Sequence, residues 1–270
     1  MAPLNFDHLF QSASASARRL ATRRFRAAGL HFLISTFVAT CVAALTFTLW
    51  YPHPFDRMAG VLSLFLLLVT VDVTLGPLLT AIAASPKKPA RELRNDILII
   101  VVLQTAAFVY GMYSVSLARP VHMAFEVDHF RVFSAANVDP DLLHDAPENL
   151  RQLSWTGPTL IAAAKPLGAD EQLKAIELGL AGFDISLIPR NWRDYETQSG
   201  AAWNAGRPLA KLIEQYPERA DLVKALVRKS GHAIDDLRFL PIISRNGDWI
   251  AVVASPGAHV IGYLPLQGFF

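Results

Sequence analysis

Three long stretches of this sequence contain almost no charged side chains, and they limit the fold more than any other feature. Residues 27–55 contain no Asp, Glu, Lys or Arg, residues 58–86 contain only Asp72, and residues 97–118 contain none. Even the shortest stretch, at 1.5 Å per residue, forms a helix of roughly 33 Å, slightly longer than the ~30 Å hydrocarbon core of a bilayer. A wholly soluble protein is therefore excluded.

The stretches predict three membrane-spanning helices, at about residues 31–50, 61–83 and 97–117. The composition agrees, because 52% of the 270 residues are apolar and only 18% are charged. The first stretch is not a signal peptide, since its basic prefix is too long, its apolar part is about twice the usual length, and no small-x-small cleavage site precedes Tyr51. The single cysteine, Cys41, lies inside this stretch and excludes an intrachain disulfide or a cysteine cluster for a metal.

Basic residues predict how the chain crosses the membrane. They concentrate in the segment before the first span and in the connector between the second and third spans: Arg18, Arg19, Arg23, Arg24, Arg26, Lys87, Lys88, Arg91 and Arg94. The positive-inside rule then places both segments in the cytoplasm. Residues 1–28 are predicted as a basic cytoplasmic segment, residues 29–118 as the transmembrane region, and residues 119–270 as a periplasmic domain.

The pattern after residue 119 predicts a small α+β domain. Residues 121–127 alternate like a strand, with Val121, Met123, Phe125 and Val127 on one face, and a weaker strand is expected at residues 160–164. Two further strands flank Asn246-Gly247, which favours a type I′ turn with positive φ at both residues, and residues 259–264 extend them into an antiparallel β-meander. Helices are expected between these regions, at about residues 170–180, 208–216 and 217–230, the last with a buried stripe of Leu222, Val223, Leu226 and Val227.

Asp72 is the most informative single residue, because a carboxylate near the middle of a membrane helix is costly unless it faces protein or water. Its depth corresponds to that of Thr40 or Cys41 in the first span and to a level between Gln104 and Tyr110 in the third. One interpretation is a contact with a partner helix or a proton relay, and an equally weighted one is an internal tie among the three helices. Gly76-Pro77, four residues later, predicts a kink. With two aromatic residues of the outer domain, these residues form the set of candidate partner contacts: Asp72, Gly76, Pro77, Gln104, Tyr110, Trp155 and Trp192.

The sequence offers no catalytic residues, no cofactor site and no metal site. A phosphate loop, a nucleophile elbow, a kinase signature and an HExxH pair are all missing from it. Asp139, Asp141, His144 and Asp145 match no metal-binding loop, and we interpret them as a solvated helix start. The basic charge is confined to short segments, so a nucleic-acid partner is not expected.

Several segments together resemble one known family. They are "VTVDVTLGPLLT" in the second span, "YGMYSVSLARPV" at the end of the third, and "MAFEVDHFRVF", "LSWTGPTLIAAA", "GFDISLIPRNW" and "LPIISRNGDWIAVVASPGAHVIGYLPLQGF" in the outer domain. These resemble the type IV pilin accessory proteins of the TfpX/TfpZ family over nearly the whole chain, apart from the first twenty or so residues.

The resemblance implies a non-enzymatic protein of the bacterial inner membrane that assists stabilisation or assembly of a cognate type IV pilin, major or minor. An immature pilin has an apolar helix in the same bilayer and a globular head outside it, so the spans and the outer domain could each contact one part. The alternative is a membrane-anchored ligand-binding sensor or transport component, although the short cytoplasmic segments leave little room for an output domain. The sequence sets no oligomeric state.

Overall fold

The computed structural model describes residues 6–84, 88–164 and 184–270. The chain divides into two compact units. The first unit consists of Met1–Leu45 and Leu62–Val115, and the second consists of Thr46–Val61 and Ser116–Phe270.

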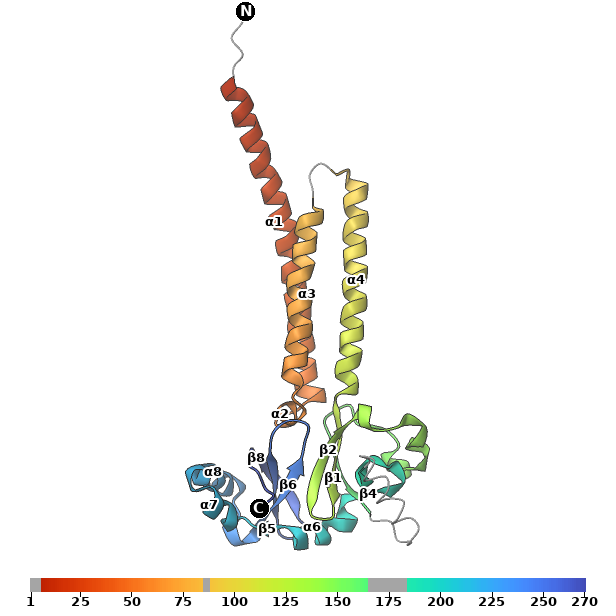
Figure 1. The fold of residues 1–270 in the computed structure, drawn as a ribbon, viewed down its shortest axis with the longest axis vertical. Coiled ribbons are helices and arrows are strands. Elements are labelled where there is room, and N and C mark those ends of the chain that lie inside the picture. Colours follow the sequence, from red (N-terminus) through yellow and green to blue (C-terminus); the bar gives the residue numbers. More distant parts are fainter. Residues whose placement is uncertain (1–5, 85–87, 165–183) are drawn as a thin grey trace, which may run out of the picture. The chain divides into compact units, whose positions relative to one another are not determined.

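Three helices make up the first unit: α1 (Phe6–Leu45), α3 (Val61–Ala83) and α4 (Ala90–Leu117) (Figure 1). Within the described residues, three helical segments are long and apolar enough to cross a membrane, namely Phe25–Trp50, Val61–Ala83 and Arg91–Leu117. Helix is the expected conformation for such segments, because it satisfies every backbone polar group without water. The predicted three apolar helices are confirmed.

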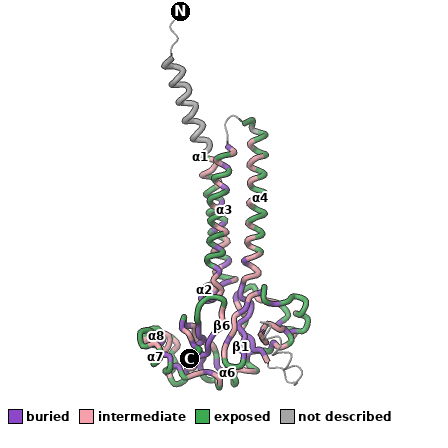
Figure 2. Tube along the Cα trace, in the orientation of Figure 1, coloured by how far each residue is buried: buried purple, intermediate pink, exposed green. Residues whose placement is uncertain are grey.

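The helices of the first unit expose apolar side chains and meet at small or polar ones. Many of their described leucines, isoleucines and valines are exposed. Exposed positions recur along the described parts of the three helices (Figure 2). Ser35 and Ala39 of α1 and Thr80 of α3 are buried, and His31 Nδ1 lies 2.6 Å from Thr80 Oγ1. Small residues and side-chain hydrogen bonds are the usual means of association between helices in lipid, where apolar contact alone gives little preference.

The second unit is built on a mixed sheet of eight strands (Figure 1). The order is β4-β3-β1-β2-β6-β7-β8, and β5 pairs with β6 beside this path. The β1–β3 and β2–β6 pairs are parallel, whereas the other pairs are antiparallel. The strands are β1 (Pro120–Glu126), β2 (His129–Ser134), β3 (Thr159–Ala163), β4 (Trp192–Asp194), β5 (Arg207–Pro208), β6 (Leu237–Ile243), β7 (Trp249–Ala254) and β8 (His259–Leu264).

Helices and short 3-10 turns cover the sheet. The described α-helices of this unit are α2 (Phe55–Ala59), α6 (Ser199–Ala205), α7 (Ala210–Gln215) and α8 (Ala220–Ser230). The π-helix η1 spans Thr46–Trp50, and the 3-10 helices are Ala135–Asn137, Pro140–Asp145, Glu148–Leu150, Ile185–Leu187, Pro189–Asn191, Tyr195–Gln198, Pro217–Arg219 and Ile234–Asp236. The three apolar spans and this helix-covered sheet confirm the predicted fold class, including the C-terminal meander.

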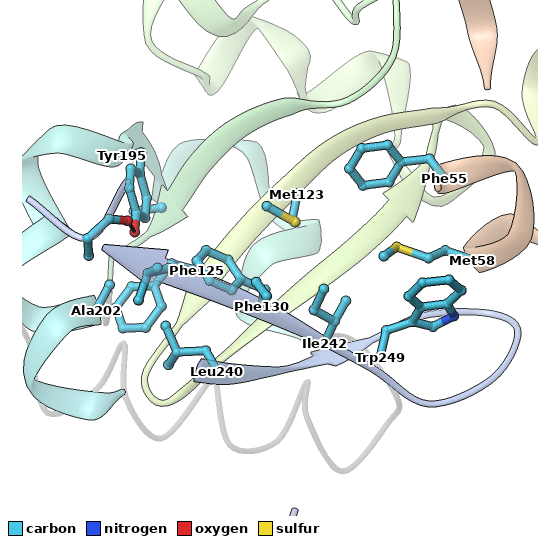
Figure 3. Close-up of a cluster of buried hydrophobic side chains, with 14 residues drawn as sticks. Phe55, Met58, Met123, Phe125, Phe130, Tyr195, Ala202, Leu240, Ile242 and Trp249 are labelled. Atoms are coloured by element: carbon cyan, nitrogen blue, oxygen red, sulfur yellow. Dashed lines mark hydrogen bonds between the residues drawn. The ribbon is translucent and has the colours of Figure 1, made fainter. Parts of the chain in front are cut away.

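The connection between the first two spans belongs to the core of this second unit. Phe55 and Met58 of α2 pack in one cluster with Met123, Ile242 and Trp249 (Figure 3). Tyr51 is also completely buried. Asn246 fixes the same connection, because its backbone N donates to Met58 O at 2.9 Å and its side-chain Nδ2 donates to Arg57 O at 2.9 Å.

The strand at residues 120–126 differs from its expected alternation. Every residue of β1 is buried, including His122 and Glu126, which the alternating pattern placed on the face opposite Val121, Met123 and Phe125. The reason is that β1 lies inside the sheet between β2 and β3 and is covered on both faces. Val127 lies outside the strand, in the turn to β2, with φ of 52°.

The turn at Asn246-Gly247 also differs from the prediction. Gly247 has φ of 76°, but Asn246 is not among the positive-φ residues of the described chain. The turn between β6 and β7 is longer than two residues, and the two hydrogen bonds from Asn246 to the residue 57–58 backbone account for its different conformation. The prediction of a two-residue type I′ turn was wrong.

The remaining predicted elements differ in detail. The weak strand is β3, the helix expected from residue 208 begins at Ala210, and the one expected from residue 217 becomes a 3-10 turn followed by α8. Leu222 of α8 is exposed, so only part of its predicted stripe is buried. The helix expected at residues 170–180 lies outside the described residues, and β2 was not predicted.

Candidate functional site

The candidate partner contacts fall into two separate groups. Five of them lie on α3 and α4 of the first unit, namely Asp72, Gly76, Pro77, Gln104 and Tyr110. Trp155 and Trp192 lie in the second unit.

Asp72 and Gln104 form a polar contact between α3 and α4. Gln104 Nε2 donates to Asp72 Oδ1 at 3.2 Å and to the main-chain oxygen of Asp72 at 3.2 Å. Gly76 lies one turn after Asp72, so both residues share a face of α3. A Cβ atom at Gly76 would overlap the Gln104 carboxamide, so a larger residue there would require this side chain to move. The sequence placed Asp72 at a depth between Gln104 and Tyr110 in the third span, and Gln104, at one end of this range, is the residue that it contacts.

This contact leaves much of α4 open. None of the described side chains of residues 91–114 is buried, and Tyr110 is 73% exposed. Tyr110 takes no part in the Asp72 contact, while Pro77 lies inside α3 directly after Gly76. The arrangement can tie two helices together and present the remaining surface of α4 to lipid or to another helix.

Trp155 is an exposed aromatic residue of the second unit. Its side chain is 54% exposed, and the Arg119 guanidinium lies 3.7 Å from its ring centroid. The centroid of the Trp50 ring lies 5.7 Å from that of Trp155, although the two residues are far apart in the sequence. Trp155 is thus held at the surface by groups from two other segments.

Trp192 is a core residue and not a surface contact. It is completely buried, its Nε1 donates to Ser186 O at 2.6 Å, and its ring lies 4.7 Å from the His122 ring. Burial lowers the pKa of His122 to about 4, so this imidazole is neutral at ordinary pH. Trp192 and His122 therefore stabilise the fold.

A buried carboxylate was missed by the sequence analysis. Glu126 Oε1 accepts from Ser186 N at 2.6 Å, and its Oε2 lies 3.2 Å from His129 Nε2 and 3.3 Å from Arg131 Nε. Burial opposes its ionisation, but hydrogen bonds with His129 and Ser186 and the charge of Arg131 outweigh burial and lower the pKa of Glu126 to about 2. Arg131 also pairs with Asp184 at 3.0 Å.

A sequence signal for this cluster exists. Glu126, His129 and Arg131 lie in one six-residue segment and flank Val127-Asp128. This spacing is expected for charges that face each other across a hairpin. The cluster is compensated internally, with the carboxylate held by two basic groups. It is suited to fixing the hairpin and not to proton transfer with a substrate.

The acidic group at residues 139–145 is a capped, solvent-exposed 3-10 turn. Asp139 Oδ1 accepts from Asp141 N at 2.9 Å, and Asp145 pairs with Arg190 at 3.1 Å. Within the residues that the structure describes, no three His, Cys, Asp or Glu side chains form a group that could hold a metal ion.

The chain is similar to known fimbrial assembly proteins. A family described as fimbrial assembly protein FimB matches residues 19–60. The fimbrial assembly proteins of Dichelobacter nodosus serogroups I and E1 are each 35% identical over 227 residues, covering 83% of this chain and 88% of each relative. The protein of serogroups C1 and C2 is 42% identical over 120 residues, covering 44% of this chain and 89% of that relative. No solved structure matches the chain.

Proposed function

This chain belongs to the fimbrial assembly protein family, and from that membership we propose that it is an accessory protein for the assembly of a type IV pilus. In this proposal it lies in the bacterial inner membrane, with its N-terminus in the cytoplasm and residues 119–270 in the periplasm. It acts without catalysis, by stabilising a cognate pilin or assisting its incorporation, as the resemblance to the TfpX/TfpZ proteins implies. The similarity to whole fimbrial assembly proteins over most of the chain is the observation that carries the proposal.

The first unit supports a contact with pilin inside the bilayer. An apolar pilin helix needs a partner helix with free surface, and α4 has no buried side chain among its described residues 91–114. The Asp72–Gln104 contact holds α3 and α4 together at one side of α4, so the side that carries Tyr110 remains accessible. We place the pilin helix against this accessible side of α4.

Crosslinking from α4 tests this placement. A photo-crosslinking amino acid at Tyr110 should capture pilin in cells that express both proteins, because Tyr110 is 73% exposed. The matched control is the same amino acid at Gln104, which faces α3 and should capture only this chain itself. If crosslinkers placed on α4 and in residues 119–270 all fail to capture pilin, the proposed partner is contradicted.

A cellular assay tests the role in assembly. Deletion of this protein should reduce surface pili formed from the cognate pilin, and expression of the intact chain should restore them. The pilin level in the membrane separates two mechanisms, because a stabilising role lowers it and an assembly role leaves it unchanged. Normal piliation in the deletion strain would reject the proposed function.

A further inference from the structure

The second unit contains an end of each predicted span. The first span ends at Trp50, the second begins at Val61 and the third ends at Leu117, and all three residues belong to this unit. The bilayer surface must therefore pass close to these residues. Any side chain of the unit held beside them lies at the level of the lipid headgroups.

Trp155 is such a side chain. It lies far along the sequence from the spans, yet its ring is 5.7 Å from that of Trp50, the last residue of the first span. Arg119, two residues after the third span, stacks on Trp155 at 3.7 Å. The same arginine donates to Ser116 O at 2.7 Å and to Ser154 O at 3.0 Å, so it links the end of α4 to the loop that carries Trp155.

The loop is also fixed from the other direction. Gly157 has φ of 84°, and a Cβ atom there would lie 2.6 Å from Pro52 Cγ. Pro52 follows the first span by two residues. The loop of Trp155 is therefore packed closely against the residues that leave the membrane after both the first and the third spans.

We infer that Trp155 inserts its exposed indole face into the headgroup region of the bilayer and so seats the outer domain on the membrane surface. Tryptophan prefers this region because its large apolar ring leaves water while its N–H group remains near polar partners. The partner is the lipid surface, since the residues beside Trp155 are those at which the chain enters and leaves the bilayer. Arg119 is 5% exposed, so the patch presents an aromatic face without an exposed guanidinium.

The chain offers a matched control for this inference. Trp203 is covered by Arg238 at 4.6 Å, an arginine–tryptophan pair of the same kind. This pair lies on α6 and β6, and Trp203 packs against the sheet core instead of a span end. A signal that follows membrane contact should therefore distinguish Trp155 from Trp203, whereas a signal that follows only local packing should not.

The experiment uses the full chain in phosphatidylcholine and phosphatidylglycerol vesicles. Cys41 is replaced by Ser, and Trp155→Cys or Trp203→Cys carries an environment-sensitive fluorophore. At position 155 we expect blue-shifted emission, quenching by spin labels attached near the lipid headgroup, and protection from aqueous iodide. At position 203 we expect no quenching by lipid-attached labels. Iodide quenching at position 155 equal to that at position 203, with no lipid quenching, would overturn the inference.

A second measurement avoids the labelled variants if they fail to fold. Brominated lipids should quench the intrinsic fluorescence of the wild-type chain, and this quenching should decrease in Trp155→Phe but not in Trp203→Phe. Equal quenching in both variants would overturn the inference. The inference would also be overturned if iodide quenched Trp155 in vesicles and this quenching were lost only after pilin was added. That result would assign the Trp155 surface to the partner protein.

Discussion

Glu126 is a buried charged residue of the second unit. Its pKa is about 2 in the folded chain against an ordinary value of 4.5, so the folded state releases its proton more easily than the unfolded state. The resulting stabilisation is present above pH 4.5 and is lost as the pH falls through the folded pKa of about 2. The pKa of His129 shifts in the opposite direction. Burial lowers it, but the interactions with Glu126 and Asp128 outweigh burial and raise it above its ordinary value of 6.5. The stabilisation from His129 is therefore present below pH 6.5 and is lost as the pH rises through the raised pKa.

Replacement of Glu126 should therefore be costly. Glu126→Gln removes the charge that faces His129 and Arg131, and we expect a loss of about 3 kcal/mol in the free energy of unfolding near neutral pH. Glu196→Gln, at an exposed position, is the control and should change stability little. Thermal unfolding of the full chain in detergent, followed by tryptophan fluorescence, measures both. A wild-type unfolding midpoint that does not fall from about pH 6 to about pH 3 would contradict this role of Glu126.

Gly157 is the residue at which backbone and space both require glycine. Its φ is 84°, and an added Cβ would lie 2.6 Å from Pro52 Cγ. Gly157→Ala should lower the free energy of unfolding by on the order of 1 to 3 kcal/mol through backbone strain and overlap. Gly200→Ala is the matched control, because Gly200 lies in α6 with open space around it and alanine there should stabilise by roughly 0.5 to 1 kcal/mol. Equal unfolding midpoints for the two variants would show that the Pro52 contact is absent.

At the scale of elements, the sequence predicted best where a single local property decides the structure. The three spans follow from uncharged length alone, and β8 was predicted with its observed bounds because a turn precedes an alternating strand. Prediction from the sequence failed where contacts between residues far apart in the sequence determine the structure. The alternation of β1 was misread because strands on both sides and packing on both faces bury His122 and Glu126, and the 246–247 turn was misread because Asn246 bonds to Arg57, 189 residues away. The candidate site followed the same division: counting residues along the helices gave a level in the third span that has Gln104 at one end, whereas the exposure of Trp155 and the burial of Trp192 depend on tertiary packing.

The contact between α3 and α4 gives a prediction at the same scale. Asp72→Asn keeps an oxygen that accepts from Gln104 Nε2, so it should leave helix association nearly unchanged. Asp72→Leu removes the acceptor and should weaken association by roughly 0.6 to 2 kcal/mol. Thr74→Leu, on an exposed part of α3, is the control. Unfolding of the full chain in mixed micelles measures the three variants.

Piliation separates the two interpretations of Asp72. If Asp72 is an internal tie, surface pili should be normal with Asp72→Asn at matched protein levels. A loss of pili with Asp72→Asn, together with a crosslink from position 72 to pilin, would instead assign the carboxylate to partner recognition. The hydrogen bonds with Gln104 lead us to expect the first result.

At the scale of the whole molecule, the charge distribution predicts the topology. A reporter fused at Ala90 should be active only as a cytoplasmic reporter, because Lys87, Lys88, Arg91 and Arg94 surround it. A reporter fused after Gly268 should be active only in the periplasm. A cytoplasmic signal from the C-terminal fusion would reject the three-span topology and, with it, the periplasmic placement of the outer domain.

The burial of Phe55 and Met58 in the second unit sets an order of events during synthesis. These residues emerge with the first connection, but their neighbours Met123, Ile242 and Trp249 are made only after the second and third spans. The domain can complete its core only when the ribosome has delivered nearly the whole chain and all three spans have been inserted. A secreted fragment that starts at residue 119 would lack part of its own interior, so a soluble version for biophysical work should carry residues 51–60 joined by a linker.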